Sequence, residues 1–95
     1  MKTESAHYLR EYGSLLRSLD ALGFELDNYL QAPDAFGNFV ADFSKGSVRF
    51  RIVRDRSQLM LEGSRSELEP LGLWRAFDEP TLFEEKLLLW LGSKV

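Results

Sequence analysis

The side chains that carry most enzymatic chemistry are scarce in this chain of 95 residues. It has no cysteine and a single histidine, His7. Disulfides, thiolate metal sites, cysteine nucleophiles and multi-histidine metal sites are therefore excluded. His7 has no second histidine with which to share a metal, so we expect a surface residue. The sequence contains no phosphate-binding loop, no dinucleotide fingerprint, and no GxSxG or HExxH motif.

Carboxylates in close pairs are the other residues that could do acid–base or metal chemistry. Glu84 and Glu85 are adjacent in a predicted helix, where neighbours point about 100° apart, so they do not form an acid–base pair. Their position in the first turns of that helix suits the helix dipole instead. Glu67 and Glu69 would face one way if their segment were extended, but a lone pair in a predicted loop is too little for a metal or glycosidase site. We expect no catalytic residue, no metal site and no cofactor. A small RNA-acting enzyme using arginine with Glu or Asp is the enzymatic alternative.

The charged residues are distributed unevenly along the chain. The net charge is -3 and the pI is near 5.1. Residues 45–56 nevertheless carry a net charge of +4, between segments of -4 and -3. These arginines either cover a sheet face with their aliphatic stems, contact a protein partner, or bind RNA. The acidic pI argues against nucleic acid, because nucleic-acid-binding proteins usually carry net positive charge.

A protein partner is therefore the expected ligand, and its contact surface is expected in one of two places. The first is the basic central hairpin, with the candidate residues Arg49, Arg51, Arg54 and Arg56. The second is the acidic segment that follows it, with the candidates Glu67, Glu69, Asp78 and Glu79. Exposed Trp74 or Phe77 would make an aromatic anchor, but we expect both to be buried.

Hydrophobic periodicity predicts the elements that must position these side chains. Residues 5–22 read as an amphipathic helix, with Leu9, Leu16 and Leu19 on its apolar face, Gly13 in its interior and Gly23 as its cap. Alternation predicts an edge strand over residues 24–30 and a meander over 39–43, 48–54 and 58–62. Residues 64–70 read as a loop, and 71–77 bring apolar groups back to a core edge. A last helix begins at Pro80, capped by Asp78 or Glu79, and ends at Gly92.

This order of elements predicts the fold class α+β, as a single domain over residues 1–95. The simplest architecture is a two-layer sandwich, an antiparallel three- to four-stranded meander flanked by an N-terminal and a C-terminal helix. The N-terminus lacks the apolar stretch of a signal peptide. The longest apolar run, Leu87–Leu91, is too short to cross a bilayer. We expect a cytoplasmic protein with no membrane contact; monomer and homodimer both remain open.

Two segments carry a resemblance to a known group of proteins. Phe36-Gly37-Asn38-Phe39, followed by the stretch Val48–Gln58 with its Arg-Asp-Arg turn, resembles small bacterial immunity proteins of polymorphic and contact-dependent toxin systems. In those proteins a Phe-Gly-Asn turn precedes a strand ending in Arg-Asp-Arg-Gly-Gln; here Ser57 stands where glycine is more usual. The resemblance implies a non-enzymatic protein that neutralises a cognate toxin by occluding its active site. It also implies that the Arg-Asp-Arg turn fixes the hairpin.

A second resemblance gives the alternative function. The step Leu22-Gly23-Phe24, at the end of the first predicted helix and before a meander, is similar to that of type III secretion chaperones. These are small, acidic α+β proteins. This resemblance implies a homodimer that binds an effector protein.

Overall fold

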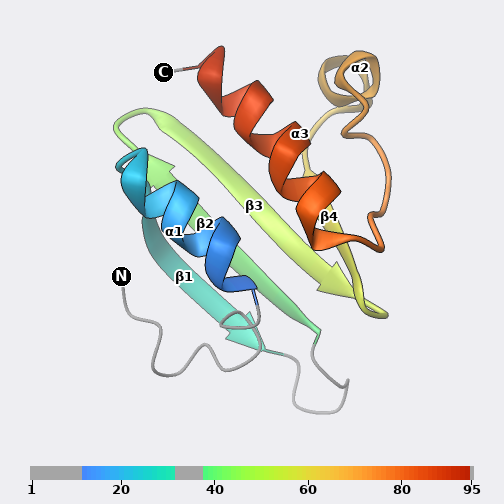
Figure 1. Ribbon diagram of the computed structural model, residues 1–95, viewed down its shortest axis with the longest axis horizontal. Coiled ribbons are helices and arrows are strands. Elements are labelled where there is room, and N and C mark those ends of the chain that lie inside the picture. The colour runs from blue at the N-terminus through green and yellow to red at the C-terminus, as the bar shows by residue number, and fades with distance from the viewer. Residues whose placement is uncertain (1–11, 32–37, 95) are drawn as a thin grey trace.

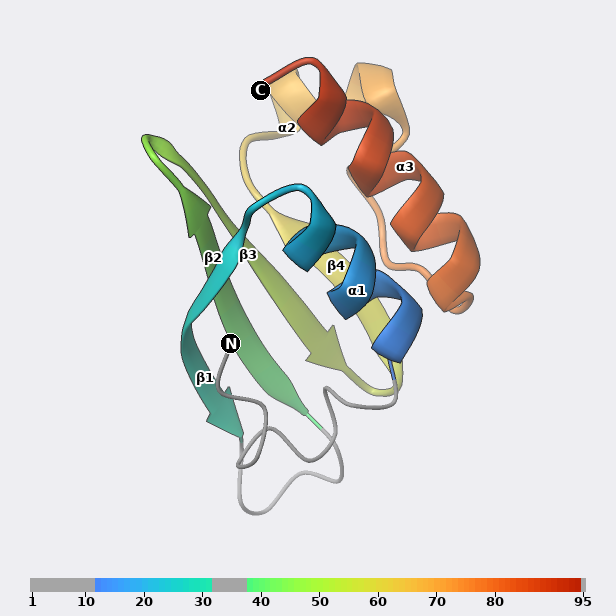
Figure 2. The same ribbon diagram turned by 60° about the vertical axis from the view of Figure 1, so that its left-hand side comes forward.

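Two helices cover one face of a four-stranded antiparallel sheet (Figures 1 and 2). The computed structural model describes residues 12–31 and 38–94. The predicted α+β fold, with a meander and flanking N- and C-terminal helices, is confirmed. Predictions for residues 1–11, including His7 and Leu9, and for Phe36 and Gly37 fall outside the described residues. In the described part of the chain, no helix is long and apolar enough to cross a membrane.

The sheet follows the order of the sequence. Its strands are β1 (Glu25–Gln31), β2 (Phe39–Lys45), β3 (Val48–Asp55) and β4 (Gln58–Glu62), paired in that order. The predicted edge strand is confirmed as β1. Between the β1–β2 pairs Leu26/Phe43 and Asn28/Asp42 lies one extra residue, Asp27. This bulge keeps Asn28 on the same face as Asp42, because opposed residues of paired strands project to one side.

The first helix, α1 (Gly13–Ala21), begins at Gly13, which the sequence pattern had placed in a helix interior. Gly23 caps its end as predicted, with a φ of 91° in the left-handed region. The Gly23 amide donates to the Asp20 carbonyl and the Phe24 amide to the Leu19 carbonyl, both at 2.9 Å, which is the Schellman arrangement. This cap turns the chain directly into β1.

The connection between β4 and the last helix is more ordered than predicted. Residues 64–70, expected to be a loop, lie instead in α2 (Arg65–Leu68) and the 3₁₀ helix η2 (Glu69–Leu71). Buried Leu68 is the reason, because it holds this turn on the core. Its carbonyl accepts the Leu73 amide at 3.0 Å as the chain reverses at Gly72 (φ 72°). The chain then returns along β4, where Leu59 and Phe77 exchange two backbone hydrogen bonds of 2.9 and 2.8 Å.

The last helix, α3 (Pro80–Gly92), has the predicted bounds. Pro80 occupies its first position, where the missing N–H costs nothing. Glu79 is the N-cap residue, although its side chain makes no capping hydrogen bond. The predicted apolar stripe is confirmed, since Phe83, Leu87, Trp90 and Leu91 are buried against the sheet.

Aromatic rings fill the space between the helices and the sheet. Phe50 of β3 lies 5.3 Å from the rings of both Phe24 and Phe43, and 6.2 Å from Trp90. Phe77 is 1% exposed, as predicted, but Trp74 is 45% exposed, and the expectation that both are buried is wrong for Trp74. Phe77 is in register with Leu59 and faces the helices. Trp74 lies three residues earlier, in a bend of the chain, and its side chain is left partly in solvent.

Candidate functional site

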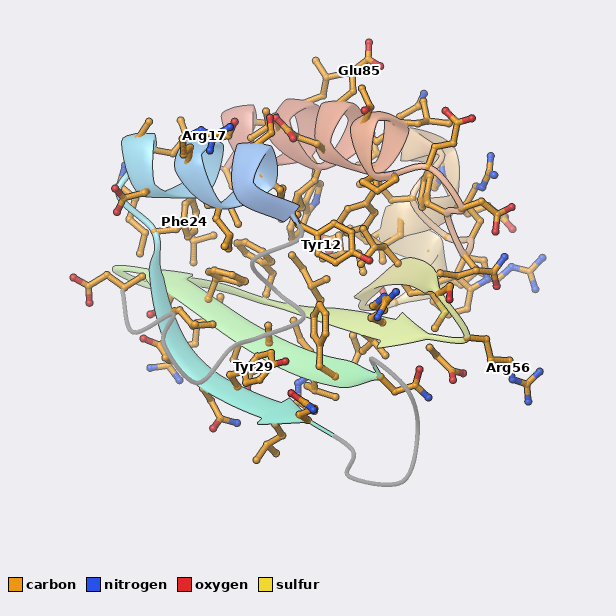
Figure 3. The ribbon with its side chains drawn as sticks, turned by 60° about the horizontal axis from the view of Figure 1, so that its bottom comes forward. Tyr12, Arg17, Phe24, Tyr29, Arg56 and Glu85 are labelled. Atoms are coloured by element: carbon orange, nitrogen blue, oxygen red, sulfur yellow. The ribbon has the colours of Figure 1, made fainter. Side chains whose placement is uncertain are left out.

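The sheet face turned away from α1 and α3 is the candidate site, and we call it the open face. Figure 3 shows the two layers from the side, with the helices on one side of the sheet and side chains projecting freely from the other. Alternate residues of each strand point to this face. An antiparallel sheet commonly leaves one face to solvent, and that face is then expected to be polar.

An apolar row nevertheless crosses the open face. Leu30 opposes Val40, Val40 opposes Val53, and Val53 opposes Met60. Ala76 continues the line beyond Met60, since the adjacent pair is Leu59 with Phe77. Val40, Val53 and Met60 are half-buried, and Leu30 is 60% exposed. We call these five residues the apolar row. They form a band that spans all four strands.

A hollow of about 330 Å³ lies at the β4 end of this row. Its walls include Val53, Met60 and Ala76 of the apolar row, together with Gly63 and the Trp74 side chain. Glu62 is the carboxylate that lines it. Arg75 also lines the hollow, so its mainly apolar walls carry one carboxylate and one guanidinium side chain.

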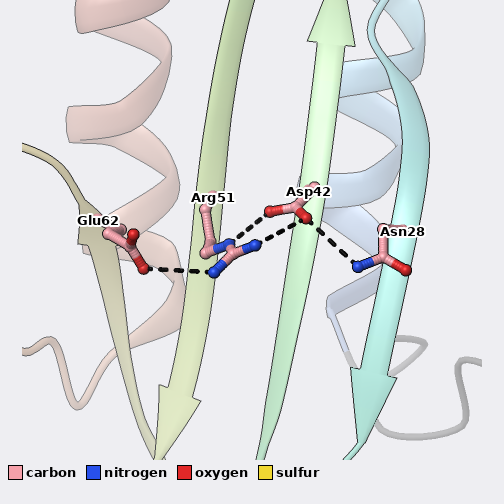
Figure 4. A network of polar contacts seen from close by, with 4 residues as sticks. All are labelled: Asn28, Asp42, Arg51 and Glu62. Carbon is pink, nitrogen blue, oxygen red and sulfur yellow. Dashed lines mark hydrogen bonds and ion pairs between the residues drawn. The ribbon is translucent and has the colours of Figure 1, made fainter.

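A polar and charged row runs beside the apolar row, two residues away on each strand (Figure 4). Arg51 donates from Nε to Asp42 Oδ1 at 2.6 Å and from Nη2 to Asp42 Oδ2 at 3.1 Å. Asn28 Nδ2 donates to Asp42 Oδ2 at 3.4 Å. On the other side, Arg51 Nη1 is 3.8 Å from Glu62 Oε2. One arginine therefore links carboxylates on both neighbouring strands.

This geometry shifts the proton affinities of the central pair. The hydrogen bonds from Arg51 hold the pKa of Asp42 below its usual value, and the bond from Asn28 adds to this, while partial burial opposes it. The same bonds to Asp42 raise the pKa of Arg51 above its usual value. Both groups are charged at neutral pH, and the charge of Arg51 is largely compensated by its neighbours.

The structure disperses the basic residues of the central hairpin. Arg49 and Arg51 share the open face, as alternation predicts. Arg54 is directed to the helix side, where its guanidinium lies 5.9 Å from the Tyr12 ring. Arg56 is in the β3–β4 turn, and Lys45 donates to the Leu22 carbonyl that ends α1. The +4 segment therefore does not form one basic patch.

The predicted acidic residues are also separated. Glu67 pairs with Lys94 at 3.0 Å, and Glu69 pairs with Arg65 at 2.8 Å, both near α2. Asp78 accepts a bond from Gln58 at 2.8 Å near the start of α3, where Glu79 is exposed. Figure 1 shows α2 and the start of α3 at opposite ends of the connecting segment. The structure thus gives two small acidic groups rather than one surface.

Three of the residues that carry the family resemblance, Asn38, Asp55 and Arg56, are hydrogen-bonded to one another at the β3–β4 turn. Asn38 Nδ2 donates to Asp55 Oδ1, and Asn38 Oδ1 accepts the Arg56 amide, both at 3.1 Å. Arg56 and Ser57 have φ of 54° and 65°, as in the two-residue type I′ turn that suits hairpins. The side chain of Asn38 thus holds the turn of the next hairpin in place.

The apolar row is the feature that sequence reasoning missed. Its signal was present, because Val40, Val53 and Met60 are apolar at positions that alternation assigns to the solvent face. Among residues 12–31 and 38–94, no group of three or more His, Asp or Glu residues is placed to hold a metal ion. The open face offers apolar contact and charge pairing, which is the chemistry of binding.

No protein-family model matches the chain, and no curated protein or solved structure matches it.

Proposed function

We propose that this chain is a non-enzymatic protein-binding module that acts as an immunity protein, neutralising a cognate bacterial toxin domain by covering its active site. The observation that carries the proposal is the apolar row of the open face, which ends at the half-exposed Trp74. A tryptophan beside a small apolar hollow is the kind of residue that dominates binding energy at protein interfaces.

Charge indicates what kind of partner the open face suits. Its acidic side chains outnumber its basic ones: Glu25, Asp27, Asp42, Asp55 and Glu62, against Arg49 and Arg51. Arg51 is already compensated by Asp42 and Glu62. A basic partner would therefore be attracted to this face and oriented on it. Many enzymes that act on nucleic acid carry such a positive surface, which suits a toxin domain.

The resemblance to immunity proteins supplies the more specific part of the proposal. The structure supports the role expected for its residues, because Asn38 and Asp55 brace the hairpin turn through their own hydrogen bonds. They stabilise the end of the sheet from which β3 and β4 project their open-face side chains. The binding energy would come from the apolar row and Trp74.

Co-expression tests this function directly. The chain should form a roughly 1:1 complex with the C-terminal domain of the toxin encoded beside it, and should protect cells that express this domain. Trp74→Ala should reduce both complex formation and protection. Leu89→Ala is the matched control, because Leu89 is 72% exposed on α3, which covers the other face of the sheet, and should change neither. Absence of both complex and protection for the unaltered chain would refute the proposal, as would a Trp74→Ala variant that protects fully.

A further inference from the structure

We propose that the hollow beside Trp74 is an anchor site for one aromatic side chain of the partner, with a lysine or arginine next to it in the partner's sequence. The inference rests on the proposed protein-binding function and names the chemistry of what binds. It combines three observations: the size and walls of the hollow, the position of Glu62, and the orientation of Arg75.

The walls of the hollow suit an aromatic ring. Met60 offers a polarizable sulfur, which makes favourable contacts with ring edges. The Trp74 indole offers a flat surface for offset or edge-to-face packing. At about 330 Å³, the hollow exceeds the roughly 150 Å³ that encloses a benzene molecule in an engineered cavity. The hollow, which is open to solvent, is therefore large enough in volume for a phenyl ring.

Glu62 determines the charge that belongs beside this ring. Its carboxylate lines the hollow and its side chain is 61% exposed. Its contact with Arg51 is long, at 3.8 Å, whereas Asp42 receives the two short bonds from Arg51. Glu62 therefore has acceptor capacity for an incoming ammonium or guanidinium group.

Arg75 also lines the hollow, and the position of its guanidinium group decides whether the hollow favours a cation. Its guanidinium lies 4.6 Å from the centre of the Phe77 ring, and Phe77 packs against Phe83 of α3 at 5.5 Å. The positive group is thus held toward the helix side of the sheet. Glu62 is left as the charge that faces the open side, which selects a cation over an anion.

Capped dipeptides test this inference on the full chain without any knowledge of the partner. Ac-Phe-Lys-NH₂, Ac-Phe-Glu-NH₂ and Ac-Ala-Lys-NH₂ are titrated into ¹⁵N-labelled protein. We expect saturable shifts of the Gly63 and Ala76 amides and of the Trp74 indole, with millimolar affinity for so small a ligand. Ac-Phe-Lys-NH₂ should bind about threefold more tightly than Ac-Phe-Glu-NH₂, the size of effect expected of one exposed ion pair. Ac-Ala-Lys-NH₂ should not saturate.

Three variants separate the parts of the site. Glu62→Gln should retain binding of the phenylalanine peptides but lose the preference for lysine. Glu25→Gln, on the same face but on the distant strand β1, should keep that preference. Ala76→Leu, which adds bulk at a residue that lines the hollow, should lose binding while the Leu59 and Phe77 amides keep their protection from exchange.

Several outcomes would overturn the inference: no saturable shift, equal affinity for the lysine and glutamate peptides, or a preference that survives Glu62→Gln. Shifts of the same amides on dilution of the chain alone would show that a second copy occupies the hollow, and would also overturn it. Failure of the toxin domain to bind, with the dipeptide preference intact, would refute the proposed function and leave the anchor site standing. A toxin complex that forms without any dipeptide preference would refute the anchor site and leave the proposed function standing.

Discussion

Replacing Trp74 by alanine should cost the fold much less than replacing Phe77, although the two aromatic residues are three positions apart. An aromatic side chain of this size presents roughly 200 Å² of surface. With 45% of Trp74 exposed, about 110 Å² is buried, which corresponds to about 2 kcal/mol after allowance for a compact unfolded chain. Truncation of a fully buried phenylalanine costs about 3–5 kcal/mol.

The contacts of Phe77 place the free energy of unfolding lost in Phe77→Ala at the upper end of that range. Its ring packs edge-on against Phe83 at 5.5 Å and lies under the Arg75 guanidinium at 4.6 Å. Both contacts disappear in Phe77→Ala, and each adds to the loss from burial. The free energy of unfolding should therefore fall at least twice as far in Phe77→Ala as in Trp74→Ala.

Urea denaturation followed by far-ultraviolet circular dichroism measures both losses, because this signal does not depend on the tryptophan that is removed. The total stability of a chain of this length is about 5–14 kcal/mol, so Trp74→Ala should remain folded at low temperature. Phe77→Ala is measurable where the stability of the unaltered chain exceeds about 5 kcal/mol. The Trp74→Ala variant should also lose the chemical-shift response to Ac-Phe-Lys-NH₂. A loss of stability in Trp74→Ala equal to that in Phe77→Ala would show that Trp74 is a core residue, and would refute the assignment of Trp74 to an interface.

Three further changes test local parts of the structure. Ser57→Gly should stabilise the fold by about 0.5–1 kcal/mol in urea denaturation, because relief of a left-handed residue exceeds the entropy cost of glycine. Gly23→Ala should destabilise the fold by about 1–2 kcal/mol, since φ there is 91°. Gly92→Ala is the control, because the added Cβ atom meets no atom within 4 Å, and it should be neutral or stabilising. Equal losses of stability in the two variants would contradict the assignment of Gly23 as the left-handed cap of α1. Carbon-detected NMR titration should find the pKa of Asp42 below 3.8 and higher again in Arg51→Gln. Because the folded-state pKa is depressed, the contribution of Asp42 to stability is present above pH 3.8 and is lost as the pH falls through the lowered pKa.

The strands and the ends of the helices followed from the sequence because their signals are local. Alternation over Val48–Arg54 sets both the extended conformation and the assignment of Arg49 and Arg51 to one face. Gly23 after a leucine stripe and Pro80 before another mark a helix end and a helix start. The short helix α2 carried a weaker local signal, the Ser64-x-x-Glu67 spacing of a capping box.

The open face could not be derived in the same way, because it depends on pairs between distant residues. The neutralisation of Arg51 requires β2 to place Asp42 opposite it, and this register is set by the β2–β3 hairpin. The Asp27 bulge then places Asn28 of β1 opposite Asp42. The exposure of Trp74 depends on the path of the chain between buried Leu73 and the Leu59–Phe77 bridge. Counting charges along residues 45–56 therefore predicted a basic patch, whereas alternation and turns direct those side chains to both faces and both ends of the sheet.

The composition of the open face favours binding over a purely structural role. A solvent-facing sheet surface gains cross-strand stability from threonine as readily as from valine, because both are β-branched. Nothing in sheet formation requires Leu30, Val40, Val53 and Met60 to be apolar in one continuous line. The line also ends beside a half-exposed tryptophan and a hollow. Neither of these features would add to the stability of a surface whose role is purely structural. Contiguous exposed apolar surface on a protein of this size is typical of interaction sites, and the charged row beside it supplies the orientation that apolar contact lacks.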